Sequence, residues 1–248
     1  MRKINLINER NYENRKARGE KIRKNQDKYY WATSLVIAKH KSNTINLIKN
    51  KNILEIGCSC GDDAIEFSKY SSFYCGIDIS DEAIKIAKKL KLENSEFLCG
   101  DGHEINKSNG EFDCVIVNSL LHHLDLKKSF FEINRILKPG GILIFREPLG
   151  TNLFFQLYRS LTPLSRTEDE RPFTLSDLRL MNKFFDIEDI QWFGFTSIVS
   201  AFIRIKKFRR ILTSLDNLIS RTFLKYFFWQ FCGFAKKKEL PSQQNPKK

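Results

Sequence analysis

The sequence has no long hydrophobic run, and this absence argues against one class of protein. Its longest charge-free, hydrophobic-rich stretch covers residues 190–203, which is 14 residues in a chain of 248. A helix that crosses a bilayer needs about 18–20 such residues, so we expect no membrane span. The first ten residues are polar and charged, which argues against a secretory leader. With 42% hydrophobic residues the chain can still bury a core, which excludes a disordered chain.

Cysteine is present but lacks the spacing of a metal site or a disulfide framework. Of the six cysteines, only Cys58 and Cys60 are close in sequence, whereas tetrahedral zinc sites generally use C-x₂₋₄-C pairs. We therefore expect no metal, and reduced thiols in a cytoplasmic protein. The chain also lacks repeats and Pro/Gly-rich linkers. We expect an N-terminal helical appendage at residues 1–50 and one domain at residues 51–248, with a helical insertion near residues 198–224.

Positive charge is concentrated at the two ends of the chain. The formal net charge is +13, and it divides into +9 for residues 1–50, −4 for residues 51–150 and +8 for the remainder. Residues 9–30 are expected to form an exposed helix or a mobile arm. Residues 202–225 combine clustered cations with apolar residues at helical spacing, so this basic amphipathic helix could lie peripherally on the inner, anionic face of a membrane. The alternative is a helix docked on the domain with a solvated basic face.

Strands and helices alternate through the middle of the sequence. Short apolar runs predict strands at residues 51–57, 72–79, 95–99, 112–118 and 142–146, with helices at residues 62–70, 80–92 and 125–137 between them. Two later strands are expected at residues 185–195 and 227–235. This alternation is typical of βαβ units, so we predict a doubly wound α/β fold with a mostly parallel, seven-stranded sheet.

The first predicted strand is followed by a turn of small residues, and this turn indicates a ligand-binding function. The segment reads Glu55-x-Gly57-x-Ser59-x-Gly61, and Asp78 follows at the end of the next strand. Such a turn lets the backbone approach a ligand closely, and an acidic residue in the position of Asp78 can accept hydrogen bonds from both ribose hydroxyls. The sequence therefore predicts a cofactor that contains a nucleoside.

The same turn argues against a dinucleotide. The fingerprint G-x-G-x-x-G would require glycine at positions 59 and 62, where this chain has Ser59 and Asp62. Asp62 and Asp63 would also face the pyrophosphate. A cofactor with a cationic sulfonium and an amino-acid end suits an acidic turn better, and we expect Glu55 to help to hold that end.

Over roughly residues 50–150 the chain resembles the class I S-adenosylmethionine-dependent methyltransferases, which have a Rossmann-like fold. The resemblance rests on the turn above, on Gly100-Asp101-Gly102, on the strand at residues 112–118 and on Leu-Lys-Pro-Gly-Gly at residues 137–141. It implies that S-adenosyl-L-methionine is the cofactor, with Asp78 on the ribose and Ile79 and Asp101 at the adenine. The cofactor-binding positions that we predict are Glu55, Gly57, Ser59, Gly61, Asp78, Ile79, Asp101, Gly102 and Asn118. Ser59 departs from the family pattern, which has glycine there.

Two residues are candidates for the chemistry. Methyl transfer to an oxygen with a high pKa needs a general base, and histidine is the usual choice near neutral pH. His122 follows the fourth strand in a Leu-Leu-His context that resembles phosphobase methyltransferases, and His123 is a weaker candidate. Glu147, at the end of the fifth strand, would orient substrate or act as the base. The alternatives are that the histidines cap or pack under a helix, and that Glu147 pairs with the basic flank.

The resemblance implies methyl transfer to a small-molecule or sugar- or lipid-linked acceptor, and we expect oxygen as the target atom. A weaker resemblance, over residues 146–152 and 166–170, is to bacterial small-molecule methyltransferases. Two alternatives stay open: an RNA methyltransferase that acts on ribose or another non-base-amine target, and an adaptor that binds the cofactor without catalysis. Nucleic acid is disfavoured because Asn118 is followed by Ser-Leu-Leu rather than the Pro-Pro-aromatic run of base-amine enzymes.

Overall fold

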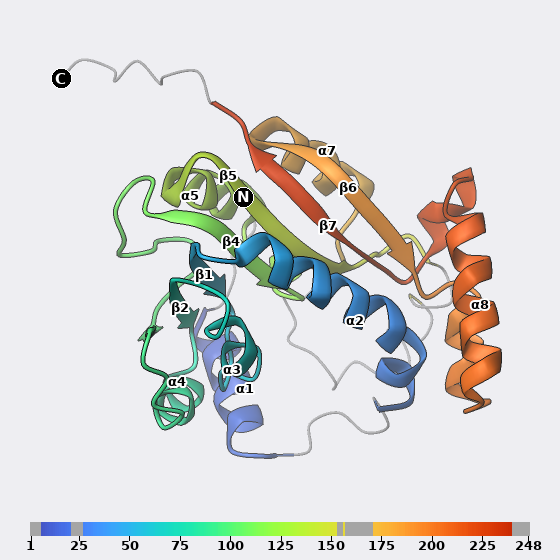
Figure 1. Cartoon of the computed structure of the whole chain (residues 1–248), viewed down its shortest axis with the longest axis horizontal. Coiled ribbons are helices and arrows are strands. Elements are labelled where there is room, and N and C mark those ends of the chain that lie inside the picture. The colour runs from blue at the N-terminus through green and yellow to red at the C-terminus, as the bar shows by residue number, and fades with distance from the viewer. Residues whose placement is uncertain (1–5, 21–26, 153–155, 157–170, 240–248) are drawn as a thin grey trace.

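The computed structural model describes residues 6–20, 27–152, 156 and 171–239, and a seven-stranded sheet forms its centre (Figure 1). The strand order is β3-β2-β1-β4-β5-β7-β6. The strands are β1 (Asn52–Ile56), β2 (Phe73–Asp78), β3 (Ser95–Cys99), β4 (Phe112–Asn118), β5 (Leu137–Pro148), β6 (Phe185–Phe193) and β7 (Gln230–Lys237). Strands β1 to β5 pair in parallel, whereas β7 runs antiparallel to both β5 and β6. The predicted doubly wound, mostly parallel sheet of seven strands is confirmed.

Helices cover both faces of the sheet. They are α1 (Leu6–Ala17), α2 (Asp27–Ile48), α3 (Ala64–Phe67), α4 (Asp81–Lys88), α5 (Leu126–Ile136), α7 (Leu175–Phe184) and α8 (Lys206–Ile219). Three 3₁₀ turns, η1 (Leu121–His123), η3 (Ser197–Ala201) and η4 (Phe223–Phe227), complete the elements used below. Among the described residues, no helix combines the length and the apolar character that crossing a bilayer requires.

Two apolar cores lie on opposite faces of the sheet, because the side chains of successive strand residues alternate between the faces. In β5, Leu143 and Phe145 pack into the core under α5 and α7. Ile144, between them, packs into the core under α2, α3 and α4. Burial on both faces explains why the central strands are almost continuously apolar in sequence.

The connections from strand to helix place polar groups at the carboxyl edge of the sheet. Strand β1 lies between β2 and β4, so the chain leaves it at the point where the strand order reverses, which is where open α/β sheets bind ligands. Ser80 caps the N-terminus of α4, since its Oγ accepts a 3.0 Å hydrogen bond from Ala83 N. Asp125 caps α5 in the same way.

Three predicted elements differ in the structure. The helix expected over residues 62–70 is shortened to α3, which has four residues. Strand β5 begins at Leu137 rather than at residue 142, because the Lys-Pro-Gly-Gly segment continues directly into the strand and Leu137 already pairs with Phe112. The helix expected over residues 198–224 is divided into η3, α8 and η4. Residues 153–155 and 157–170, which include the weaker resemblance at residues 166–170, lie outside the described residues.

Candidate functional site

The bend after β1 adopts the backbone that its glycines permit. Gly57 and Gly61 have φ angles of +80° and +84°, and Ser59 between them has +48°. A Cβ at Gly57 would meet Leu120 Cδ2 at 2.9 Å, so a side chain there would displace Leu120 in addition to straining the backbone. Ser59 occupies the left-handed region with a side chain, which costs roughly 1 kcal/mol. The sequence departure at Ser59 is therefore tolerated at a small conformational cost.

Four backbone N–H groups of this bend already donate hydrogen bonds within the chain. Those of Gly57 and Cys58 donate to Ile77 O at 2.7 and 3.1 Å, and that of Gly61 donates to Cys58 O at 2.9 Å. The N–H of Ser59 donates to Asp78 Oδ2 at 2.9 Å. A pyrophosphate needs such N–H groups as donors, so these four do not form a diphosphate cradle.

Asp78 ends β2 with its carboxylate at the bend. Its Oδ2 accepts from Ser59 N, and its Oδ1 accepts from Ser80 N at 2.8 Å. Burial raises the pKa of Asp78, and the two backbone N–H donors from Ser80 and Ser59 oppose that shift. Each carboxylate oxygen has further lone pairs, so both can accept hydroxyl donors. The geometry therefore suits the paired hydroxyls of a ribose.

A cavity of about 230 Å³ opens beside the bend, at the carboxyl edge of the sheet. It is lined by α1, by the bend, and by the segments that follow β2, β3 and β4. Seven of the nine predicted cofactor-binding residues line it: Gly57, Ser59, Asp78, Ile79, Asp101, Gly102 and Asn118. The structure therefore brings together positions that are up to 61 residues apart in the sequence.

Glu55 and Gly61 do not line the cavity. Glu55 is 4% exposed, and its Oε2 accepts a 2.5 Å hydrogen bond from Tyr74 Oη. Burial first, and then the nearby Asp63 charge, raise the pKa of Glu55 to about 8. Glu55 thus lies beneath the bend, and the prediction that it holds the amino-acid end of the cofactor is not supported by its position. Gly61 instead allows close packing, since a Cβ there would meet Leu90 Cδ1 at 2.8 Å.

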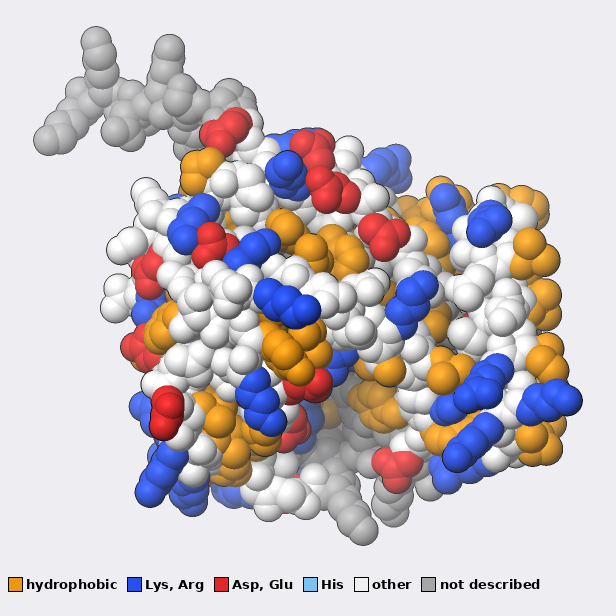
Figure 2. Space-filling view, in the orientation of Figure 1, with side chains coloured by type: hydrophobic (Ala, Val, Ile, Leu, Met, Phe, Trp, Pro, Cys, Tyr) orange, Lys and Arg blue, Asp and Glu red, His pale blue; other side chains and the backbone are white. Residues whose placement is uncertain are grey.

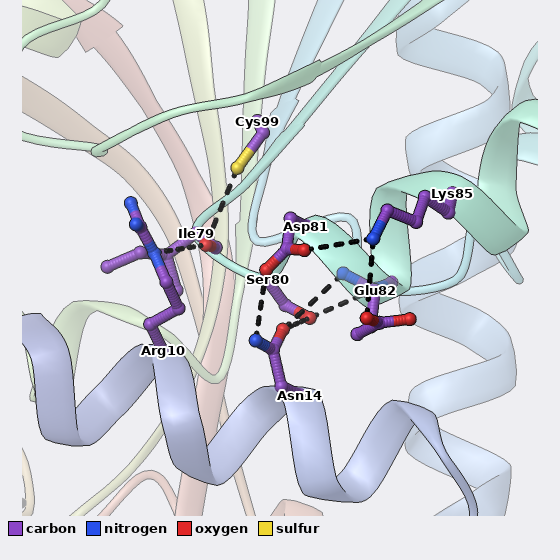
Figure 3. Close-up of polar contacts among 9 residues, drawn as sticks. Arg10, Asn14, Ile79, Ser80, Asp81, Glu82, Lys85 and Cys99 are labelled. Carbon is purple, nitrogen blue, oxygen red and sulfur yellow. Dashed lines mark hydrogen bonds and ion pairs between the residues drawn. The ribbon is translucent and has the colours of Figure 1, made fainter.

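Helix α1 lies over the cavity. Of the two alternatives predicted for residues 9–30, a helix is confirmed in this part, but several of its side chains line the cavity. Figure 3 shows Asn14 of α1 between Ser80 and Asp81 at the start of α4. Asn14 Oδ1 accepts from Ser80 Oγ at 2.6 Å, and Asn14 Nδ2 donates to Asp81 Oδ1 at 2.9 Å. Arg10 Nε donates to Ile79 O at 3.1 Å. The helix is held by polar contacts, which a hydrophobic pattern cannot reveal.

The charged side chains that line the cavity are mainly acidic. Glu9 and Glu13 come from α1, and Asp78 and Asp101 come from the sheet edge, against one lysine, Lys16. Burial alone would raise the pKa of Asp101, but its hydrogen bonds with His103 hold it below its usual value. An acidic cavity attracts a cationic ligand and repels a diphosphate.

His103 fixes the position of Asp101. The His103 Nε2 atom accepts from Asp125 N at 2.8 Å, so the ring proton lies on Nδ1. That Nδ1 is 2.6 Å from Asp101 Oδ1 and donates to it. Asp101 is thus oriented at the cavity edge, where the family resemblance predicts that it contacts the adenine.

Asn118 provides a direct test of the cofactor fit. It ends β4 and lines the cavity. Its Oδ1 is buried and has no hydrogen-bond partner among the described residues. A buried acceptor without a donor is costly, so a ligand N–H or O–H group fits this position. The residues at the cavity are therefore compatible with a nucleoside cofactor that carries a positive charge.

His122 and Glu147 form a buried pair next to the cavity. His122 Nδ1 lies 2.7 Å from Glu147 Oε2, and Glu147 Oε1 accepts from Leu120 N and Leu121 N at 2.9 and 2.8 Å. Glu147 is fully buried and does not line the cavity. The predicted direct contact of Glu147 with substrate therefore has no support in the structure, because its oxygens face His122 and the backbone. The alternative pairing with the basic flank is also wrong.

His123 is the histidine that lines the cavity itself. Its Nδ1 lies 3.2 Å from Glu9 Oε1 of α1, and its ring centroid is 4.2 Å from that of His122. The two histidines therefore lie side by side, one paired with the helix over the cavity and the other with Glu147. In the part of the chain that the structure describes, no three His, Cys, Asp or Glu side chains gather as they would around a metal ion.

Sequence reasoning did not identify the residues that α1 contributes. They are Leu6, Glu9, Glu13 and Lys16. One usable signal is that Leu6, Glu9, Glu13 and Lys16 recur at helical spacing of three or four residues, which places them on one face of a helix. Ser119, Leu120 and Leu124 were also missed, although they belong to the segment that the sequence places beside the cofactor.

Comparison with known proteins finds a family model that matches part of the chain, including most of the bend and sheet edge around the cavity. Residues 54–145 match the family described as a methyltransferase domain. YqeM of Bacillus subtilis, named as a candidate methyltransferase, is 32% identical over 108 residues, which are 40% of this chain and 43% of YqeM. A demethylmenaquinone methyltransferase of Staphylococcus epidermidis is 28% identical over 128 residues, 48% of this chain and 53% of that enzyme. The chain thus spans about half the length of these curated relatives.

Solved structures share the fold over most of the chain. Geranyl diphosphate C-methyltransferase of Streptomyces coelicolor, in complex with Mg²⁺, geranyl diphosphate and S-adenosyl-L-homocysteine, has a TM-score of 0.63 and 12% sequence identity. The match covers 83% of this chain and 80% of that one. At this identity the likeness establishes the fold.

Proposed function

We propose that this chain, which belongs to the class I S-adenosylmethionine-dependent methyltransferases, transfers the methyl group of S-adenosyl-L-methionine to a small acceptor. The observation that carries the proposal is the acidic cavity, in which Asp78, Asp101, Glu9 and Glu13 surround the position expected for a cationic cofactor. The N–H groups of Gly57, Cys58, Ser59 and Gly61 already donate hydrogen bonds within the chain, which disfavours a diphosphate at the same place.

The residues of the cavity would bind and orient the cofactor. Asp78 would accept hydrogen bonds from the ribose hydroxyls, and Asp101 would accept from the adenine amino group. Asn118 Oδ1 would accept a donor from the cofactor or the acceptor, which would satisfy a buried oxygen without a partner among the described residues. When bound, the cofactor supplies an activated methyl group, so the main tasks of the protein are alignment and exclusion of water. Helix α1 would exclude water, because it lies over the cavity.

His122 would be the general base for a hydroxyl acceptor. The ionised Glu147 carboxylate can only accept a hydrogen bond, so the ring proton of His122 lies on Nδ1 and points at Glu147 Oε2. The basic lone pair of the imidazole then lies on Nε2. Glu147 would act through His122 as a positioning residue, in the manner of the carboxylate that orients histidine in hydrolytic triads. His123 is the alternative base, because it lines the cavity.

The acceptor would be a small molecule or a lipid-linked compound, with oxygen as the accepting atom. The name of the Staphylococcus epidermidis relative refers to demethylmenaquinone, which favours a small-molecule acceptor. The exposed apolar and basic segment around α8 supports a peripheral contact with an anionic membrane.

Calorimetry tests the cofactor assignment first. We expect heat on mixing with S-adenosyl-L-methionine and with S-adenosyl-L-homocysteine, and none with a nicotinamide or flavin dinucleotide. An acceptor screen that detects by mass a product about 14 Da heavier than the acceptor then tests transfer. Binding of a dinucleotide without binding of the methyl donor would overturn the proposal, and donor binding without turnover on any acceptor would favour a non-catalytic adaptor.

A further inference from the structure

Exposed hydrophobic side chains are concentrated in one segment, residues 197–227, which we call the basic insertion. Of the sixteen large hydrophobic side chains that are exposed among the described residues, ten lie here. They are Val199, Phe202, Ile203, Ile205, Ile211, Leu215, Leu218, Phe223, Tyr226 and Phe227. Scattered exposed hydrophobic residues are normal, but a contiguous set marks an interaction surface.

Helix α8 shows how the exposed set is arranged. Its half-buried side chains, Phe208, Leu212 and Ile219, face the rest of the protein. Ile211, Leu215 and Leu218 recur at i, i+4 and i+7, so they form a second apolar stripe. They are 57%, 40% and 63% exposed. Figure 2 shows hydrophobic side chains along the outer edge of α8, with lysine and arginine side chains beside them.

The charge of the basic insertion is almost entirely positive. It contains seven cations, Arg204, Lys206, Lys207, Arg209, Arg210, Arg221 and Lys225, and one acid, Asp216. Asp216 is 1% exposed, and its carboxylate accepts from Gly194 N, Thr196 N and Ser197 Oγ at 3.1, 2.6 and 2.6 Å. The acid therefore stabilises the turn that leads into η3. It leaves the cationic surface without an acidic partner of its own.

One cation has a structural role. Arg209 lies 4.3 Å from the ring of Trp31 and donates to Trp31 O and Ser34 Oγ of α2 at 2.9 and 2.6 Å. This contact fixes α8 against α2, so the exposed stripe is held on a rigid element. Lys206, Lys207 and Arg210 remain exposed around it.

We infer that the basic insertion docks this protein on an anionic lipid bilayer. Apolar side chains beside cations match the boundary between acyl chains and anionic headgroups. A nucleic acid would use the cations but would leave the aliphatic stripe in water. A second copy of the chain would bring two strongly positive faces together, which is unfavourable.

The basic insertion also lies at the edge of the sheet where the cavity opens. Strand β7 starts at Gln230 opposite Pro148, the last residue of β5. Asn152 Nδ2, just past β5, donates to Phe227 O at 2.7 Å. Because parallel strands end at this edge, docking would turn the cavity edge towards the bilayer. The inference about the acceptor rests on the proposed methyl transfer: the acceptor would be an amphiphile of the membrane.

Vesicle flotation with the full chain tests the docking. We expect the protein to float with vesicles of phosphatidylcholine and phosphatidylglycerol, and at least tenfold less with phosphatidylcholine alone or in high salt. The double variant Ile211→Ser, Leu218→Ser and the double variant Lys207→Glu, Arg210→Glu should each reduce flotation at least tenfold. Ile86→Ser, which changes an exposed isoleucine on α4, should leave flotation unchanged. Circular dichroism verifies that each variant is folded.

Each alternative partner gives a result that would overturn the docking. For RNA, the result would be a gel shift by a protein that does not bind vesicles. For a second copy of the chain, it would be a wild-type dimer that does not bind vesicles, together with a monomeric Ile211→Ser, Leu218→Ser variant. Calorimetric binding of the methyl donor should be equal in the wild type and both double variants. A failure of flotation with normal donor binding therefore refutes the docking alone, whereas a failure of donor binding refutes the proposed function.

Discussion

The imidazole Nδ1 of His122 lies 2.7 Å from the buried carboxylate of Glu147. The other oxygen of that carboxylate accepts two backbone N–H groups, from Leu120 and Leu121. One acidic side chain thus fixes both the ring of His122 and the turn that carries it. The pair links the end of β5 to the segment after β4, at the edge of the candidate site.

Glu147→Gln tests whether this pair sets the tautomer of His122. The glutamine oxygen would still accept from Leu120 N and Leu121 N, so its NH₂ group would face His122 Nδ1. The ring would then hold its proton on Nε2 and lose its basic lone pair there. We expect kcat to fall by roughly 10²–10⁴-fold, with little change in the KM of the acceptor. Steady-state kinetics as a function of pH measures both, and the acidic limb of the wild-type profile should disappear.

The matched control is Glu132→Gln. Glu132 is also a buried carboxylate that accepts a backbone N–H, from Ile105 at 2.7 Å, but it lies outside the cavity lining. This variant should lose stability and keep kcat. If Glu147→Gln behaved like Glu132→Gln, Glu147 would have only a structural role. A base at His123 would predict that His123→Asn, and not His122→Asn, abolishes the acidic limb.

Asp78→Ala tests the ribose position. The carboxylate is expected to accept both ribose hydroxyls, and hydrogen bonds to a charged group contribute about 1.5–3 kcal/mol each. We expect the Kd of the methyl donor, measured by calorimetry, to rise roughly 100-fold or more, while thermal unfolding shows a folded protein. Glu82→Ala, on the first turn of α4, is the control and should bind normally. Unchanged donor affinity in a folded Asp78→Ala protein would contradict the assignment.

Asn14→Ala tests the attachment of α1. Asn14 is the residue through which α1 contacts both Ser80 and Asp81, and each lost hydrogen bond costs about 0.5–1.5 kcal/mol. We expect faster hydrogen exchange over residues 6–17 and a roughly tenfold weaker binding of the methyl donor. Asn46→Ala, at an exposed position of α2, should change neither quantity. Equal exchange in the two variants would mean that α1 is held by other contacts.

The sheet could be predicted from the sequence because its central strands are buried on both faces. Ile53, Leu54, Val115 and Ile116 are all fully buried, so each strand is a nearly continuous apolar run that ends at a polar residue or glycine. Asp78 and Asn118 could be placed at the carboxyl edge of the sheet, beside the cavity, for the same reason, since both end such runs. The local sequence is sufficient to predict a strand and its end wherever the strand is buried on both faces of the sheet.

The position of α1 and the division of the basic insertion could not be predicted in this way. Helix α1 is attached by Asn14 and Arg10, which are polar contacts between segments about 65 residues apart in the sequence. The turn before α8 is held by Asp216, which lies about twenty residues further along the chain. A hydrophobic pattern cannot predict such polar pairings, because they depend on which elements the tertiary fold brings together.

Glu55→Gln tests the buried acid beneath the bend. The pKa of Glu55 is raised from 4.5 to about 8 in the folded protein, so between these values the folded chain holds a proton that the unfolded chain releases. The stability from this proton is fully present below about pH 4.5 and is lost as the pH rises towards 8. The loss is on the order of 1 kcal/mol per pH unit across that window.

Glutamine cannot ionise, so Glu55→Gln should lack this loss. Urea unfolding at pH 5.5 and pH 8.5 should give a smaller decrease in the free energy of unfolding for the variant than for the wild type. Glu93→Gln, at an exposed position, controls for the removal of a carboxylate and should match the wild type. If the wild type and Glu55→Gln lost the same stability between the two pH values, Glu55 would be ionised in the folded protein.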